Sequence, residues 1–224
     1  MKNLYGQNVC IIAPHPDDEV LGLGGSICKL VNNGIKVNLL IISGHLPPLY
    51  PESSFETTKK ECIKSSKILG LNDVEFAKIP ATYINNEPIS KLNNIIQNFI
   101  SKHSPQTVFI PFPDRHIDHK LIFEACMVCT RPTGKFWPKL VLSYETLSET
   151  DWNAPYIEPV FIPEWFIDIE DFIETKLKAL GCYESQIKNN LSRNEEAVKA
   201  LARYRGSQNG YSYAEGFKLI RILN

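Results

Sequence analysis

The chain has 224 residues, of which 43% are hydrophobic, and this length and composition predict one globular domain with a single substantial core. Its 24 Lys and Arg residues balance 25 Asp and Glu residues, so the formal net charge of −1 gives no global positive field and argues against a nucleic-acid partner. The apolar stretches are far shorter than the ~20 residues that span a bilayer, and the polar amino terminus lacks the apolar core of a signal peptide, which predicts a cytoplasmic protein without a membrane anchor.

Strand-like and helix-like periods alternate along the first 130 residues. The predicted elements are a strand at 8–13, a helix at 20–32, a strand at 36–43, a helix at 55–69, a strand at 74–80, a helix at 89–103, a strand at 107–112 and a helix at 118–130. Strands that are regularly separated by helices predict a mostly parallel sheet with helices on both faces. The expected fold is therefore a doubly wound, Rossmann-like α/β fold.

The pattern after residue 130 is less regular. Residues 139–147 and 160–169 predict two later strands, and prolines at 155, 159 and 163 indicate edge or irregular pieces. Helical patterns resume from Asp171. Because no internal repeat, low-complexity tract or Gly/Ser linker marks a second domain, we expect residues 1–224 to form one domain.

Two clusters of acidic residues and histidines follow two of the predicted strands. Pro14-His15-Pro16-Asp17-Asp18-Glu19 follows the first strand, and Asp114-Arg115-His116-Ile117-Asp118-His119 follows the fourth. In open α/β sheets, ligands bind outside the carboxyl ends of the strands, where the strand order reverses. If the sheet has the common order 3-2-1-4-5, the first and fourth strands are neighbours at that point. We therefore expect the two clusters to form one site.

His15, Asp18 and His119 offer two imidazole nitrogens and a carboxylate. This set suits a catalytic zinc ion (Zn2+) with one position open for water. It also suits Fe2+, since two histidines and one carboxylate form the facial triad of oxygenases. We favour zinc, and we expect Asp17, which lies beside a ligand but is free itself, to accept a proton from the activated water.

His116 precedes His119 by three residues at the start of a predicted helix, so it is expected to project to a similar side. It can stabilise an oxyanion or protonate a leaving amine. We expect the nearby Asp118 carboxylate to favour the protonated form of His116, and Asp118 also to hydrogen-bond a histidine of the metal site. Glu19 is expected only to interact favourably with the helix dipole.

Other residues that suggest chemistry receive structural interpretations. The run Gly22-Leu23-Gly24-Gly25 lacks the third glycine of a phosphate-binding G-x-G-x-x-G motif and predicts close helix packing instead. His45 and His103 have no partners in the sequence and are predicted to be structural. Cys126 and Cys129 form a C-x-x-C pair, but no second Cys or His pair lies at zinc-finger spacing, so a structural role is expected.

The two clusters together resemble the paired HPDDE and HxDH motifs of the LmbE/PIG-L deacetylases. The similarity extends to Glu61 with Leu69-Gly70, Tyr144-Glu145, Arg203-Tyr204-Arg205-Gly206 and Tyr213-Ala214-Glu215. The resemblance implies zinc on His15, Asp18 and His119, with Asp17 as general base and His116 as the electrophilic or acid partner. Two features depart from the family pattern: Lys59 and Lys60 occupy the region where many relatives carry arginine, and Asp114 lies where some relatives carry tyrosine.

Members of that family remove acetyl groups from N-acetylglucosamine-type groups. The resemblance therefore implies a hydrolase that acts on an N-acetylated amino sugar or its conjugate, such as a sugar nucleotide or a cell-surface glycan precursor. Because we expect no membrane anchor, we favour a cytosolic precursor such as a sugar nucleotide. Loop 46–51 and Trp152 are candidates for lining a sugar pocket, with an ordinary surface loop as the alternative. The oligomeric state is open, and a homo-oligomer is compatible with the sequence.

Two other functions use the same residues. One is an Fe2+ oxygenase with the facial triad, and the other is a metal-dependent sugar-binding module without turnover. Oxygenases of this kind typically use a β jelly roll, which the alternation of strands and helices opposes, although fold does not fix function. A binding module has no need of Asp17 and His116 beside the ligands, so their presence favours catalysis.

Overall fold

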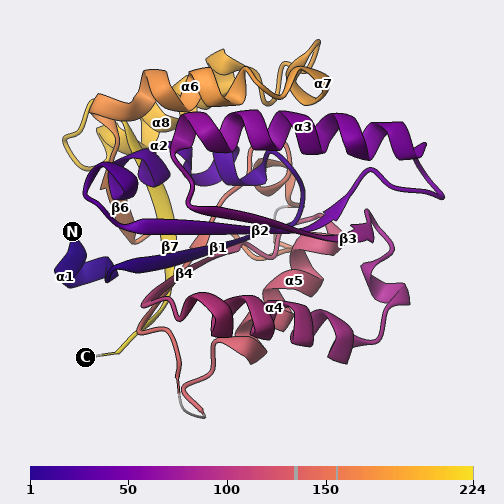
Figure 1. Ribbon diagram of the computed structural model, residues 1–224. Helices are drawn as coiled ribbons and strands as arrows, with labels where there is room; N and C mark the ends of the chain where they lie inside the picture. The colour runs from indigo at the N-terminus through magenta and orange to yellow at the C-terminus, as the bar shows by residue number, and fades with distance from the viewer. Residues whose placement is uncertain (134–135, 155, 224) are drawn as a thin grey trace.

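One mixed sheet organises the computed structural model, which describes residues 1–133, 136–154 and 156–223. Its strand order is β3-β2-β1-β4-β5-β7-β6 (Figure 1). The strands are β1 (Asn8–Ala13), β2 (Lys36–Gly44), β3 (Asp73–Pro80), β4 (Thr107–Pro111), β5 (Leu140–Tyr144), β6 (Trp165–Asp168) and β7 (Ala214–Ile222). The first five strands pair in parallel, and β7 pairs antiparallel with β5 and with β6. The predicted order 3-2-1-4-5 is confirmed.

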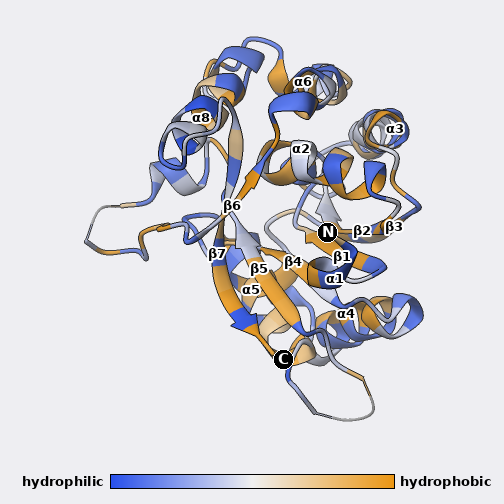
Figure 2. Cartoon of the chain, turned by 90° about the vertical axis from the view of Figure 1, so that its left-hand side faces the viewer, coloured by the Kyte–Doolittle hydropathy of each residue, from blue (hydrophilic) through white to orange (hydrophobic). Residues whose placement is uncertain are grey.

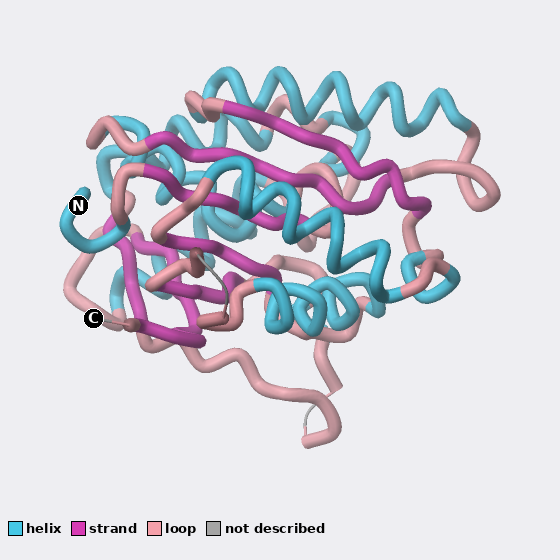
Figure 3. The backbone as a smooth tube through the Cα atoms, turned by 60° about the horizontal axis from the view of Figure 1, so that its bottom comes forward, coloured by secondary structure: helices cyan, strands magenta, loops and turns pink. Residues whose placement is uncertain are grey.

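Helices cover both faces of this sheet, with α2, α3, α6 and α8 on one side and α4 and α5 on the other (Figure 1). The helices are α1 (Lys2–Tyr5), α2 (Asp18–Asn32), α3 (Glu52–Leu69), α4 (Ile89–His103), α5 (Ile117–Cys129), α6 (Ile173–Leu180), α7 (Glu184–Ile187) and α8 (Glu195–Ser207), with 3-10 turns η1 (Ile84–Asn86), η2 (Thr150–Trp152) and η3 (Glu170–Phe172). Figure 3 shows the strands as a layer between helices. The doubly wound, mostly parallel α/β fold is confirmed. Within the described residues, none of these helices is sufficiently long and apolar to cross a bilayer.

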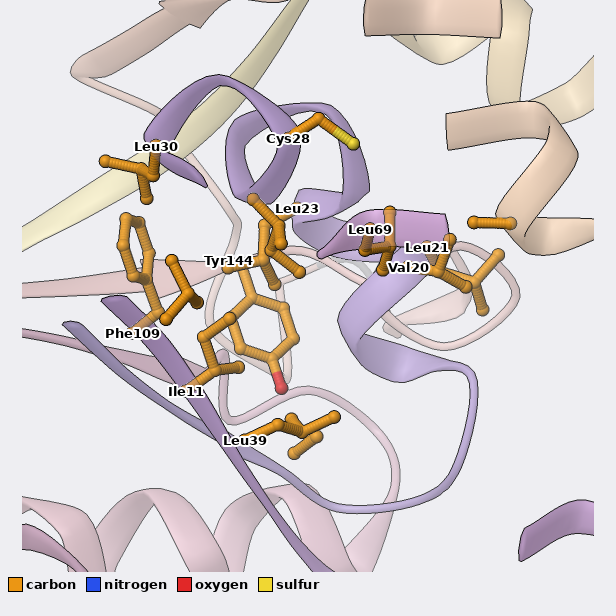
Figure 4. Close-up of a cluster of buried hydrophobic side chains, with 14 of the residues drawn as sticks. Ile11, Val20, Leu21, Leu23, Cys28, Leu30, Leu39, Leu69, Phe109 and Tyr144 are labelled. Carbon is orange, nitrogen blue, oxygen red and sulfur yellow. The ribbon is translucent and has the colours of Figure 1, made fainter. Parts of the chain in front are cut away.

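Each face of the sheet buries its own apolar cluster. Successive side chains of a strand point to opposite faces, so Ile11 joins one cluster and Ile12 the other, and both are fully buried. The central strands are therefore apolar along their length, while the outer faces of the helices are hydrophilic (Figure 2). Figure 4 shows the first cluster packed around the ring of Tyr144, whose hydroxyl donates to the carbonyl of Ile12 at 2.9 Å.

The sheet departs from the sequence-based expectation after α5. The strand predicted at 139–147 ends at Tyr144, because the chain then turns towards η2 and Ser148 adopts a φ of 66°. The strand predicted at 160–169 is shortened to β6. Sequence analysis assigned no strand to the last residues, which form β7 between β5 and β6. Pro155 lies outside the described residues.

Helix α2 is interrupted at Leu23, whose φ of −146° and ψ of 24° are not helical. Glu215 of β7 accepts the backbone N–H groups of Gly25 at 2.9 Å and Ser26 at 2.7 Å, just after the break. Lys176 of α6 donates to a carbonyl oxygen before the break and to Glu215 at 2.6 Å. This buried ion pair thus satisfies backbone groups that the break leaves without helical partners.

The glycines around the break allow α2 to lie very close to its neighbours. A Cβ atom on Gly22 would lie 2.4 Å from the ring of Tyr144, and one on Gly25 would lie 2.7 Å from Ile169. Real Cβ atoms do not approach other atoms so closely, so only glycine fits at both positions. The predicted close packing of residues 22–25 is confirmed.

Candidate metal centre

The two acidic-histidine clusters meet at the carboxyl ends of β1 and β4, which are adjacent in the sheet. One cluster occupies the turn between β1 and α2, and the other occupies the start of α5. His15 Nε2 lies 2.9 Å from Asp118 Oδ2 although 103 residues separate them in the chain. The expectation that the two clusters face each other is confirmed by this contact.

Three of the expected ligand residues are grouped so that they could hold one ion. His15, Asp18 and His119 each offer a ligand atom, and these atoms lie within 4.8 Å of one another. His15 Nδ1 is 3.3 Å and His119 Nε2 is 3.4 Å from the same oxygen, Asp18 Oδ2. Within the described residues, the buried His119 Nε2 has no hydrogen-bond partner. Because a buried polar atom without a partner is costly, this nitrogen fits a metal ligand.

A second grouping of His15, His116 and Asp118 also satisfies the distance criterion for an ion. In this grouping, however, Asp118 Oδ2 already accepts from His15 Nε2 and from the backbone N–H of Thr82 at 2.8 Å. His116 Nδ1 is likewise occupied, because it accepts the backbone N–H of Asp118 at 3.1 Å. The set of His15, Asp18 and His119 therefore fits a metal ion better.

A carboxylate lies behind each histidine of this set. Asp118 holds Nε2 of His15, and Asp114 Oδ2 accepts from His119 Nδ1 at 2.9 Å. Asp114 is itself held by the hydroxyl of Thr150 at 2.9 Å. Such carboxylates fix the ring orientation and leave the opposite nitrogen for the ion. Sequence reasoning anticipated Asp118 in this position but missed Asp114, although its place at the end of β4 was a signal.

The charges around these histidines favour a cation. Burial lowers the pKa of both rings, but the bonds to Asp118 and Asp18 outweigh it and raise the pKa of His15 to about 9, while Asp18 and Asp114 raise that of His119 to about 10. Burial acts to raise the pKa of Asp18, yet the two histidines hold it well below its usual range. Three carboxylates thus create a negative potential that retains protons and would equally attract a divalent ion.

His116 is the residue for which the electrostatic expectation is wrong. The Asp118 carboxylate bonds His15 and does not hold a proton on His116. Burial, and after it the positive charges of His15 and His119, together lower the pKa of His116 to about 4. Its Nδ1 accepts a backbone N–H, so the neutral ring carries its proton on Nε2. His116 therefore offers a neutral hydrogen-bond donor and not an imidazolium.

Asp17 lies next to Asp18 in the chain, beside the proposed ligands. Its side chain is buried, and its backbone is constrained to a φ of 117°. Its Oδ2 accepts from Nη1 of Arg193 at 2.9 Å, and its backbone N–H donates to Glu19 at 3.2 Å. Burial raises the pKa of Asp17 to about 7 against the opposing charge of Arg193. Glu19 lies in the first turn of α2 as predicted, but it is fully buried and accepts the hydroxyl of Tyr183 at 2.5 Å.

Arg193 was missed by sequence reasoning. It lies 176 residues from Asp17, between α7 and α8, and no motif surrounds it. Its side chain is only 16% exposed, which is unusual for an arginine and marks it as a residue with a specific partner. The sequence alone does not reveal this burial.

Two cavities open beside these residues. A cavity of about 300 Å³ is lined by His15, Asp17, Asp18, His45, Tyr50, Ala81, Thr82, His116, Glu149, Gln186, Asn190 and Arg193. A cavity of about 360 Å³ is lined by His45, Tyr50, Ser53, Ser54, Thr57, Thr58, Ser185 and Gln186. The three shared residues make the two cavities neighbours. Loop 46–51 thus contributes Tyr50 to both.

The remaining residues singled out in the sequence have different positions. His45, expected to be structural, borders both cavities, whereas Trp152 lines neither. His103 lies at the end of α4 with Nε2 3.3 Å from Asp73 and does not line either cavity. Cys126 and Cys129 are buried in α5, as a structural role predicts.

Comparisons with known proteins agree with the sequence motifs. A family model described as PIG-L, GlcNAc-PI de-N-acetylase, matches residues 10–130, which include both clusters. The diacetylchitobiose deacetylase of Thermococcus kodakarensis is 29% identical to this chain, over 96% of this chain and 83% of its own length.

Two solved structures share the fold. The N,N'-diacetylchitobiose deacetylase from Pyrococcus horikoshii has a TM-score of 0.77 and 23% identity, covering 96% of this chain and 84% of that one. GalB, the 4-carboxy-2-hydroxymuconate hydratase from Pseudomonas putida KT2440, has a TM-score of 0.76 and 18% identity, covering 97% of this chain and 98% of that one. Because their names describe different reactions, this likeness establishes the fold and not the activity.

Proposed function

The chain belongs to the PIG-L family, and we propose that it is a metal-dependent hydrolase that removes the acetyl group from an N-acetylated amino sugar or its conjugate. The observation that carries this proposal is the position of Asp17 beside the group formed by His15, Asp18 and His119. A cation site flanked by a carboxylate that is not one of its proposed ligands suits the activation of water. The name of the Thermococcus relative, a deacetylase of an N-acetylated sugar, supports the same reaction.

In this proposal, His15 Nδ1, Asp18 and His119 Nε2 hold the ion. When bound, a zinc ion would lower the pKa of a water molecule from 15.7 toward ~7 and polarise the amide carbonyl. Hydrolysis of an amide requires no redox change, which favours zinc over Fe2+. Asp118 and Asp114 keep the two imidazole rings in the tautomers that leave these nitrogens free.

Asp17 and His116 then divide the proton chemistry. Asp17 accepts a proton from the attacking water, for which a carboxyl with a pKa near neutrality is well suited. The Nε2–H of the neutral His116 donates a hydrogen bond to the carbonyl oxygen as negative charge develops on it. Asp17 passes the proton to the leaving nitrogen as the C–N bond breaks. The products are acetate and a free amine.

The lining of the cavities suggests which substrates fit. The amino sugar would occupy the cavity that contains His116, and the rest of the conjugate would extend into the second cavity. Among the described residues, those that line the second cavity include no Lys or Arg, and burial lowers the pKa of His45. Hydroxyl, amide and aromatic groups suit an uncharged sugar ring better than a pyrophosphate. We therefore favour a glycan precursor over a sugar nucleotide.

One assay tests this function. Zinc-reconstituted protein is incubated with N-acetylglucosamine, diacetylchitobiose and UDP-N-acetylglucosamine, and acetate and free amine are both measured. We expect equal amounts of the two products, with diacetylchitobiose the preferred substrate. Faster release from the nucleotide would reverse the substrate preference, and metal-loaded protein that releases nothing from any N-acetyl sugar would reject the function.

The two other functions considered from the sequence require different outcomes. An Fe2+ oxygenase would consume oxygen with a co-substrate and form no amine from an acetamide. A binding module would bind the N-acetyl sugar and return it unchanged. The α/β fold differs from the jelly roll typical of facial-triad oxygenases, and the buried pair of Asp17 and Arg193 is not needed for sugar binding alone.

A further inference from the structure

The segment of residues 181–194 joins α6 to α8. It lies beside the candidate metal centre although it is far from His15, Asp18 and His119 in the sequence. It includes α7, which lies beside α3 (Figure 1). Glu61 of α3 fixes this segment by accepting the backbone N–H of Ser185 at 2.9 Å and its hydroxyl at 2.5 Å. The segment therefore has a defined position over the cavity, to which it contributes Gln186, Asn190 and Arg193.

Two side chains of this segment hold Asp17 from two directions. Arg193 bonds its carboxylate through Nη1, as described above. Tyr183 donates to Glu19, and Glu19 in turn accepts the backbone N–H of Asp17. The left-handed backbone conformation of Asp17 is unfavourable for an aspartate and persists only where the surroundings impose it. One segment thus constrains both the backbone and the carboxylate of the same residue.

The guanidinium of Arg193 is itself fixed at three points. Besides Asp17, it contacts Ser148, to which Nε donates at 2.8 Å and Nη2 also donates. Nη2 lies 3.4 Å from Glu149 Oε1. A planar guanidinium held by several acceptors cannot rotate freely, and a carboxylate bonded to it through one oxygen is restricted as well. Within the described residues, Asp17 Oδ1 forms no hydrogen bond, so it is the oxygen left for a proton.

We propose that Arg193 is a positioning residue, which orients the Asp17 carboxylate so that Oδ1 faces the attacking water. The expected effect on kcat rests on the proposed function, whereas the orientation of the Asp17 carboxylate is a structural property that can be tested without it. Lysine cannot replace arginine fully, since a single ammonium group cannot span Asp17, Ser148 and Glu149 in the same plane. An alternative role for Arg193 is to bind an anionic group of the substrate.

The test combines Arg193→Gln and Arg193→Lys with Arg115→Gln as a matched control. Arg115 also pairs with Glu149, at 3.1 Å, but it is 41% exposed and does not contact Asp17. We expect Arg193→Gln to lower kcat on the order of 10²-fold with little change in KM or metal content, as when a base is misplaced. Arg193→Lys should lose less, the control should keep its kcat, and added guanidinium ion should partly restore Arg193→Gln.

A double-mutant cycle shows whether Arg193 acts through Asp17. In an Asp17→Asn background, Arg193→Gln should cause almost no further loss of kcat, because the group that it positions is already inactive. An equal loss in both backgrounds would overturn the proposal. A raised KM with unchanged kcat would do the same and would assign Arg193 to substrate binding.

Crystal structures of the wild type and Arg193→Gln give a readout that does not need activity. We expect the Asp17 carboxylate to turn or to occupy more than one orientation in the variant, while His15, Asp18 and His119 remain in place. An unchanged, fully ordered Asp17 carboxylate would overturn the proposal. If the wild type releases no acetate from any substrate but Asp17 does turn in the variant, the proposed function fails and the positioning role of Arg193 stands.

Discussion

The carboxylate of Asp114 lies 2.9 Å from Nδ1 of His119, and both side chains are fully buried. This bond leaves His119 Nε2 directed towards Asp18, at 3.4 Å. Asp114, which was not among the functional residues expected from the sequence, therefore holds one of the proposed metal ligands. Its contribution to metal affinity can be measured separately from its contribution to folding.

We expect Asp114→Asn to weaken zinc binding by about 10–100-fold, the usual effect of losing a carboxylate behind a metal-bound histidine. The amide keeps the shape of the side chain but loses its charge. Competition with a chromophoric chelator measures the affinity. Thr150→Val, which removes another donor to the same Asp114 oxygen, is the control and should lose much less affinity. Wild-type affinity in Asp114→Asn would show that this contact does not support the site.

Asp17→Asn should retain the metal and lose most of its turnover. The amide preserves the hydrogen-bonding shape but cannot accept a proton, and general base catalysis contributes typically about 10²–10⁴-fold. Metal content by mass spectrometry and kcat with an acetamide sugar are measured on the same sample. Near wild-type kcat in this variant would mean that a different group acts as the base.

The pH dependence of kcat should show whether Asp17 or His116 is the group that titrates. Asp17 must be deprotonated to act, and burial raises its pKa to about 7, so kcat should fall as the pH drops below neutrality. A bound cation adds positive charge and shifts this fall to lower pH. The pKa of His116 is lowered to about 4, so the ring stays neutral through the same range. The fall should therefore persist in His116→Gln, and its disappearance there would assign the titration to His116.

His116→Ala should lower kcat on the order of 10²-fold with unchanged metal content, because removing a donor to a developing oxyanion has this effect. Loss of the metal in this variant would instead make His116 a ligand. His103→Ala provides a histidine control away from both cavities.

Metal binding should release protons. The pKa of His15 is raised to about 9 and that of His119 to about 10, so both rings are protonated at pH 7 and must lose their protons to bind an ion. Titration calorimetry in buffers of different ionisation enthalpy should show close to two protons released per ion.

The stability of the metal-free protein should also depend on pH. Because folding raises the pKa of both His15 and His119, the protonated rings stabilise the metal-free protein fully below about pH 6.5. This contribution is lost as the pH rises through 9 to 10, which chemical denaturation of the metal-free protein can measure.

The sequence was sufficient to locate the central part of the site. The regular alternation of strands and helices up to α5 specified the parallel core, and the clusters around His15 and His119 directly follow their strands. Local patterns are sufficient for this prediction because a residue that directly follows a strand must lie at the carboxyl end of that strand. The meeting of the two clusters still required an assumed strand order, which the structure confirms.

Apart from the contact between Asp114 and His119, the contacts that the sequence did not reveal come from the last part of the chain. Arg193 lies in an irregular segment whose position depends on the packing of α7 against α3. Glu215 reaches the break in α2 only because β7 inserts between β5 and β6. No local pattern encodes which strand β7 will pair with. The state of His116 was predicted wrongly because proximity in sequence to Asp118 did not decide which histidine the carboxylate bonds.

In the proposed function, one ion held by His15, Asp18 and His119 makes the protein a deacetylase. The most direct measurement is acetate release from diacetylchitobiose while zinc is titrated into metal-free protein. We predict that the rate rises linearly and stops rising at one ion per chain, and that it stays at background in His15→Ala/His119→Ala. Full activity in the metal-free protein would show that deacetylation needs no ion, and activity of the double variant equal to that of the wild type would show that His15 and His119 do not hold it.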